Sequence, residues 1–75
     1  MNKNKLVSVM KLHGDTGQNL ADYLGVARTT ISAKINETRA EFTQREISKI
    51  KKRYNLTPNE VDEIFFEEKV SLIDT

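Results

Sequence analysis

Two short helical patterns meet at a glycine in the first half of the chain. Apolar or small side chains between Leu20 and Leu24 fall on one helical face, and Gly25 then interrupts the pattern. A second apolar face begins with Ile31 and Ile35. Two short helices joined by a glycine-containing turn of about three or four residues form a helix-turn-helix. The stretch therefore predicts this motif, with an ordinary helical hairpin as the simpler alternative.

The second helix of this motif leaves four residues off its apolar side: Arg28, Thr29, Ser32 and Ala33. A short helix that carries an arginine and small polar residues outward fits the major groove of DNA. Arg28 is the leading candidate because its guanidinium can donate two hydrogen bonds to guanine, although a phosphate contact or a solvated side chain is the alternative. Thr29 and Ser32 suit several base edges, and Ala33 suits a thymine methyl group. We therefore predict that these four residues read bases.

Charge is distributed unevenly along the chain. Residues 1–57 contain eleven Lys or Arg against five Asp or Glu, whereas residues 58–75 contain one Lys against six acidic residues. A phosphate backbone is attracted to the first part and repelled by the second. Lys3 and Lys5 are candidates for a basic N-terminal arm. The alternative is a solvated surface whose asymmetry has no function.

Length and composition narrow the remaining functional classes. The 75 residues suffice for one small domain but leave little room for a cofactor pocket, so no cofactor is expected. There is no cysteine, which excludes a cysteine nucleophile, and His13 is the single histidine, which argues against a metal site. The apolar run from Leu6 to Met10 is too short for a signal peptide or a membrane span. We expect a non-enzymatic protein of the bacterial cytoplasm with no membrane partner.

The helical periodicity elsewhere predicts an all-α fold with five helices in a single domain. Thr43 and Thr57 each begin a capping-box pattern, in which a hydroxyl and a glutamate three residues later satisfy backbone N–H groups. Ala27, at the start of the third helix, has no side-chain acceptor for this purpose. The predicted helices cover residues 3–12, 17–24, 28–36, 44–54 and 58–66. The tail, residues 67–75, is compatible with a short strand or a frayed end.

Adjacent aromatic residues near the C-terminal end suggest a second surface. A helix cannot easily bury both Phe65 and Phe66 in one small core, so we expect one ring inside and one near the surface. An exposed apolar patch of this kind marks an interface. The alternative is that both rings cover the bottom of the core. The residues predicted for a dimer or partner interface are Phe65, Phe66, Val70, Leu72 and Ile73.

Three blocks of sequence resemble the lambda-repressor-like helix-turn-helix family, and within it the short Cro-type regulators of phages that infect Gram-positive bacteria. They are LADYLGVARTTIS (20–32), EFTQREI (41–47) and IFFEEKV (64–70). The resemblance implies a five-helix domain whose third helix reads bases. It also implies phosphate contacts at the start of the second helix and just after the third. Together with the polar residues near these places, the predicted phosphate contacts are Gly17, Gln18, Thr30, Lys34, Asn36, Thr38 and Arg39.

Two positions depart from the family pattern. Gly17 stands where the family often has a glutamine that grips phosphate, so backbone N–H groups would have to take that role here. Glu37 follows Asn36 where the family often has glycine, and an acidic side chain near phosphate is unfavourable.

The sequence leaves two functional hypotheses. The first is a Cro-like repressor that binds double-stranded operator DNA as a homodimer in a phage lysis–lysogeny switch. The second is an antirepressor or modulator that binds the phage repressor protein and has weak or no DNA binding of its own.

Overall fold

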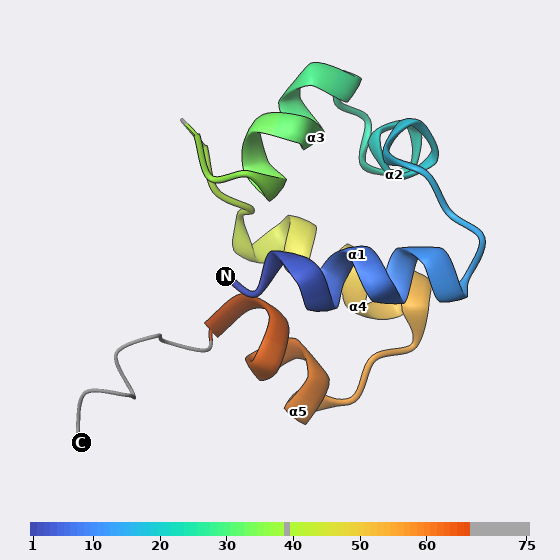
Figure 1. The fold of residues 1–75 in the computed structure, drawn as a ribbon, viewed down its shortest axis with the longest axis vertical. Helices are drawn as coiled ribbons and strands as arrows, with labels where there is room; N and C mark the ends of the chain where they lie inside the picture. The colour runs from blue at the N-terminus through green and yellow to red at the C-terminus, as the bar shows by residue number, and fades with distance from the viewer. Residues whose placement is uncertain (39, 67–75) are drawn as a thin grey trace.

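The structure is a computed structural model that describes residues 1–38 and 40–66, and this part of the chain is all-helical, as predicted (Figure 1). Helices α1 (Lys3–Leu12), α2 (Gly17–Leu24) and α4 (Gln44–Tyr54) have the bounds expected from the sequence. Helix α3 (Arg28–Ile35) ends one residue earlier than predicted, because Asn36 is its C-terminal cap.

The last predicted helix consists of two segments. Helix α5 (Pro58–Val61) continues directly into a π-helix, η1 (Asp62–Phe66), where the sequence predicts one continuous α-helix. The backbone N–H of Asn2 donates to the carbonyl of Ile64 at 2.7 Å, so η1 is attached to the start of the chain. Four residues predicted for function lie outside the described residues: Arg39, Val70, Leu72 and Ile73.

Threonine hydroxyls fix the starts of three helices. Thr16, Thr43 and Thr57 each accept a hydrogen bond from the backbone N–H three residues later. At Thr43 and Thr57 the glutamate at that later position also accepts from the threonine N–H, which completes both predicted capping boxes. Ala27, the residue before α3, provides no side-chain cap, and this lack costs about 1 kcal/mol relative to Ser or Thr. The stability of α3 therefore depends more on packing.

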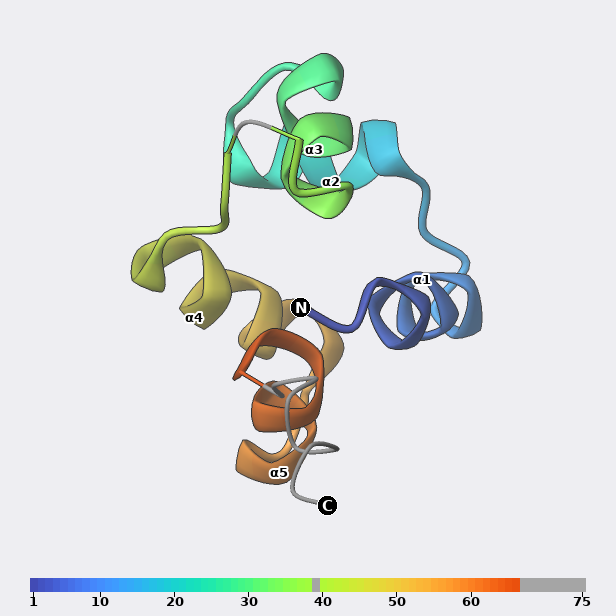
Figure 2. The same cartoon turned by 60° about the vertical axis from the view of Figure 1, so that its left-hand side comes forward.

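The core is assembled from every part of the fold. Its largest fully buried side chains come one each from α1, α2, α3, α4 and η1, and they are Leu6, Leu20, Ile31, Ile50 and Ile64. Leu12, the last residue of α1, is 83% exposed and does not belong to this core. Figures 1 and 2 place α2 and α3 at one end of the molecule and α5 at the other, with α1 and α4 between them. Helix α3 therefore lies at the end of the molecule that is opposite α5.

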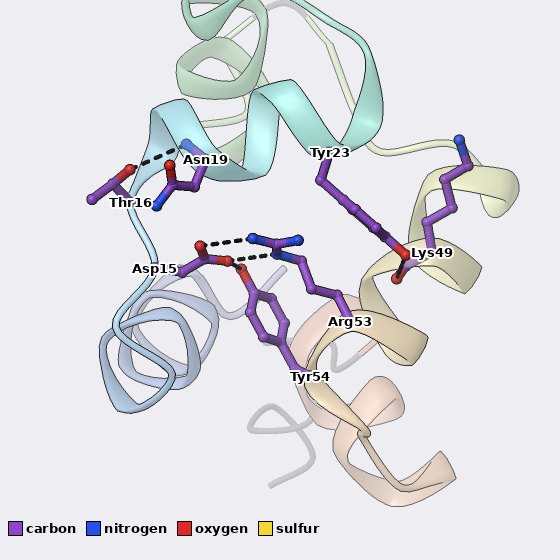
Figure 3. A network of polar contacts seen from close by, with 7 residues as sticks. All are labelled: Asp15, Thr16, Asn19, Tyr23, Lys49, Arg53 and Tyr54. Atoms are coloured by element: carbon purple, nitrogen blue, oxygen red, sulfur yellow. Dashed lines mark hydrogen bonds and ion pairs between the residues drawn. The ribbon is translucent and has the colours of Figure 1, made fainter.

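A polar network ties the loop before α2 to α4 (Figure 3). The guanidinium of Arg53 donates to both carboxylate oxygens of Asp15, at 2.7 and 2.9 Å, and the hydroxyl of Tyr54 donates to the same carboxylate. Nearby, the Tyr23 hydroxyl donates to the carbonyl of Lys49 at 3.3 Å, and the Arg53 guanidinium lies 4.7 Å from the centre of the Tyr23 ring. These contacts hold α2 against α4.

The Asp15 network makes stability depend on pH. The hydrogen bonds from Arg53 outweigh the opposing effect of burial and, with the Tyr54 hydroxyl, lower the pKa of Asp15 from 3.8 to about 2. A carboxylate whose pKa falls on folding stabilises the folded state above its unfolded pKa, and this contribution is lost as the pH falls through the folded pKa. Because Arg53 is partly exposed, we expect only about 1–2 kcal/mol from this source.

The expected result concerns the difference in unfolding free energy between the wild type and Asp15→Asn. This difference is largest above pH 4 and shrinks by about 1–2 kcal/mol as the pH falls to 2. Urea unfolding at a series of pH values, followed by circular dichroism, measures it. A difference that stays constant over this range would contradict the role assigned to Asp15.

Candidate nucleic-acid interface

The four predicted base-reading residues lie together on the outward side of α3. Arg28, Thr29 and Ser32 are exposed and Ala33 is half-buried. Ile31 is anchored in the core and is only 1% exposed. Arg28 and Thr29 lie four and three residues before Ser32, so these three exposed residues share one side of the helix.

The turn between α2 and α3 begins at Gly25, the residue that interrupts the apolar pattern in the sequence. Gly25 caps α2 with a φ of 75°, which is in the left-handed region. A Cβ atom at Gly25 would meet nothing within 4 Å, so glycine is favoured here by backbone conformation rather than by space. The N–H of Val26 then donates to the carbonyl of Ala21 at 3.0 Å. The left-handed conformation of Gly25 and this hydrogen bond set the direction in which the chain enters α3.

Lys34 requires a correction, because it does not lie on the outward side with a phosphate-binding role. Its residue surface is 9% exposed, and its Nζ donates to both carboxylate oxygens of Glu46 at 2.6 and 2.7 Å. Position 34 follows Ile31 by three residues and therefore faces α4 with it. The ammonium also lies 5.9 Å from the centre of the Phe42 ring. Lys34 is thus a structural link between α3 and α4.

The partner of Lys34 is held in its ionised form. Burial tends to raise the pKa of Glu46, but hydrogen bonds from Lys34 and from the Thr43 backbone outweigh it, and the pKa is lowered overall. Glu46 therefore serves two purposes, because the same carboxylate completes the capping box of α4.

The other residues predicted to contact phosphate differ in their exposure and in their hydrogen-bond partners. Gly17 is the first residue of α2, and its N–H is among those that have no intrahelical partner. Gln18 is exposed, and its amide donates to Asp22 within the same helix at 2.9 Å. Thr38 is exposed and Thr30 is half-buried.

An open groove of about 260 Å³ runs along one flank of α3. It brings the start of α1 and the start of α2 beside the outward side of α3, an association that sequence reasoning did not find. Its lining residues are Lys3, Gly17, Arg28, Ile31, Ser32, Ile35 and Asn36.

Two residues just after α3 have partners within the protein. The side-chain oxygen of Asn36 accepts a hydrogen bond from the Nζ of Lys3 at 2.6 Å, so Lys3 is docked on α3 rather than extended as an arm. Glu37, which departs from the family pattern, adopts a φ of 53° and pairs with the amino group of Met1 at 3.1 Å. The negative charge of Glu37 is thereby directed toward a positive group of the protein.

A second surface, which carries two aromatic rings, lies near the end of η1. Phe65 is half-buried and packs edge-on against Phe42 with 5.7 Å between ring centres, whereas Phe66 is 47% exposed. The prediction that one ring packs inward and the other stays near the surface is therefore confirmed. Both rings line a groove of about 380 Å³. Its other walls are apolar at Met1, Phe42 and Ile47 and polar or charged at Lys34, Glu37, Glu41 and Gln44.

Residues 1–38 and 40–66 contain neither a metal-binding cluster nor a membrane-spanning helix. In this part of the chain, no three His, Cys, Asp or Glu side chains are grouped so that they could hold a metal ion. Within the same residues, no helix has the length and apolar character needed to cross a membrane.

Comparison of the chain with protein-family models, curated proteins and solved structures finds no match. The outward side of α3 is consequently the main basis for assigning a function.

Proposed function

We propose that this chain is a sequence-specific regulator that binds double-stranded DNA and belongs to the lambda-repressor-like, Cro-type class, with α3 as its recognition helix. One observation carries the proposal. Arg28, Thr29 and Ser32 form an exposed polar stripe on α3, and Ile31 fixes the same helix in the core. The position of α3 at one end of the molecule supports it further, because a duplex can approach that end without meeting α5 (Figure 2).

In the proposed complex, some residues contact bases and others contact phosphates. The guanidinium of Arg28 donates to guanine O6 and N7, the hydroxyls of Thr29 and Ser32 bond to base edges, and the methyl group of Ala33 contacts thymine. Such contacts to bases give sequence preference, whereas contacts to phosphates set the register of the protein on the duplex.

Phosphate contacts are proposed on both sides of α3. Backbone N–H groups of Gly17 and Gln18 meet a phosphate at the start of α2, where the helix dipole favours an anion. Thr30 and Thr38 contribute hydroxyls, and the sequence alone adds Arg39. Because Lys34 is paired to Glu46, it is not among the proposed phosphate contacts.

The proposed active form is a homodimer on a palindromic operator. A two-fold dimer presents its two recognition helices to successive major grooves, about 34 Å apart. The groove beside Phe66 is the surface available for that contact, and the biological role is repression in a phage lysis–lysogeny switch.

The same groove supports a second candidate function, a modulator that binds the phage repressor protein. A side chain as apolar as Phe66 that remains 47% exposed beside a groove is typical of an interaction surface. In this alternative the outward side of α3 makes at most weak contact with DNA.

Selection of duplexes from a random pool by the purified chain separates the two. Under the DNA-binding proposal, one palindromic sequence with guanine in each half is enriched. Its log association constant falls linearly with log salt concentration, by about 0.9 for each phosphate neutralised. If no sequence is enriched and the chain shifts DNA only when the repressor is present, the second function replaces the first.

A further inference from the structure

The start of α1 and the end of α3 are joined by a short chain of hydrogen bonds. The Nζ of Lys3 donates to the side-chain oxygen of Asn36 at 2.6 Å. The side-chain nitrogen of Asn36 donates in turn to the carbonyl of Ser32 at 2.9 Å and lies 3.5 Å from the Ser32 hydroxyl oxygen. Lys3 is 33 residues away from Asn36 in sequence, so this connection is tertiary.

Asn36 is held in one orientation by its two neighbours. An ammonium group can only donate hydrogen bonds, so the amide oxygen of Asn36 must face Lys3 and its NH₂ group must face Ser32. The backbone N–H of Asn36 also donates to the Ser32 carbonyl, at 3.0 Å. Ser32 therefore receives two hydrogen bonds from one residue whose side-chain orientation Lys3 decides.

We propose that Lys3 is a specificity-determining positioning residue, which acts through Asn36 to orient the Ser32 hydroxyl as a hydrogen-bond donor toward the DNA bases. This inference rests on the proposed function. Because the Ser32 oxygen faces the NH₂ group of Asn36, its own hydrogen points away from that group. A donor in this position matches the acceptors N7 and O6 of purines and O4 of thymine, but not the amino group of cytosine.

The groove places this network at the recognition surface. Lys3, Ser32 and Asn36 line the same groove as Arg28, so the network borders the strongest candidate for base reading. Asn36 thereby has a role in shaping α3, and its predicted phosphate contact is not needed.

The test measures base discrimination in variants of the full chain. Ser32→Ala first identifies the base pair at which Ser32 contributes, because preference is reduced there. We expect Lys3→Met, which keeps the apolar stem, to reduce discrimination against cytosine at that same base pair by about three- to tenfold. Lys3→Arg, which retains a donor, preserves it, as does the control Lys11→Met on the same helix. Combining Lys3→Met with Ser32→Ala adds no further loss.

The salt dependence separates positioning from direct phosphate binding. A positioning role leaves the slope of log affinity against log salt unchanged in Lys3→Met. A uniform loss over all sequences with a slope less steep by about one would make Lys3 a phosphate contact and overturn the proposal. Unchanged discrimination would also overturn it.

The network itself is tested in the free protein, independently of DNA. Lys3→Met should shift the side-chain amide resonances of Asn36 and the backbone amide of Ser32, whereas Lys11→Met should not. Unchanged resonances would refute the network even if DNA is bound. If instead these resonances respond but the wild type enriches no duplex, the proposed function fails and the positioning role fails with it.

Discussion

Glu46→Ala is expected to lower the free energy of unfolding by about 3–4 kcal/mol. The substitution leaves the ammonium of Lys34 without its carboxylate partner at a site where both side chains are nearly buried, 11% and 13% exposed. It also removes the glutamate that completes the capping box at Thr43. Folded chains of this length are commonly stable by only about 4–11 kcal/mol, so much of the native stability disappears. Urea unfolding followed by circular dichroism gives the value.

A second capping box supplies the control. Glu60 completes the same box at Thr57 but faces no buried lysine among the described contacts, so Glu60→Ala should cost only about 1 kcal/mol. The double variant Lys34→Met/Glu46→Gln keeps a capping side chain and replaces the charges, and it should recover most of the loss. Equal effects of Glu46→Ala and Glu60→Ala would show that the ion pair contributes nothing.

Arg28→Ala should weaken binding to the selected duplex by about 1–3 kcal/mol, which is about 5- to 150-fold in affinity. The loss is concentrated at one guanine per half-site, because only there are the two hydrogen bonds of the guanidinium missing. Arg28 is exposed at the first position of α3, so the fold and its unfolding free energy should remain unchanged. Fluorescence anisotropy with the selected duplex and its singly substituted versions measures both affinity and preference.

The variant Arg28→Lys tests whether recognition depends on the shape of the side chain or on its charge. Lysine keeps the positive charge but lacks the planar fork, so preference for guanine should fall while the salt dependence stays as in the wild type. If Arg28→Lys behaves as the wild type at every base pair, Arg28 contacts phosphate and does not read sequence.

Local chemistry explains why most of the helical architecture could be predicted. Threonine at a helix start, Gly25 and Asn55 at helix ends, and apolar residues three or four apart act within a few residues of each other. The transition from α5 to η1 at Asp62 had no such local sign, and nothing in the structure explains why the helix widens there.

The same distinction, between local patterns and tertiary contacts, applies to the residues of the candidate site. Helical spacing alone predicts that Arg28, Thr29 and Ser32 share one side of the helix, and in the structure they do. Lys34 is predicted as a phosphate contact because it is a polar residue near the end of the third helix, whereas its spacing of three from Ile31 puts it on the inner side. Its partner is twelve residues away, so sequence could not identify the pair.

Other tertiary contacts were equally beyond sequence reasoning. The bond from Lys3 to Asn36 spans 33 residues, and the contact between Arg53 and Asp15 spans 38. Each depends on how whole helices pack, since polar residues of these types are abundant throughout the chain.

The most direct measurement for the central claim is the set of intermolecular nuclear Overhauser effects between the isotope-labelled chain and the selected duplex. We predict contacts from Arg28, Ser32 and the methyl group of Ala33 to base protons in the major groove. Contacts limited to the sugar–phosphate backbone, or confined to the surface around Phe65 and Phe66, would contradict the assignment of α3 as the recognition helix.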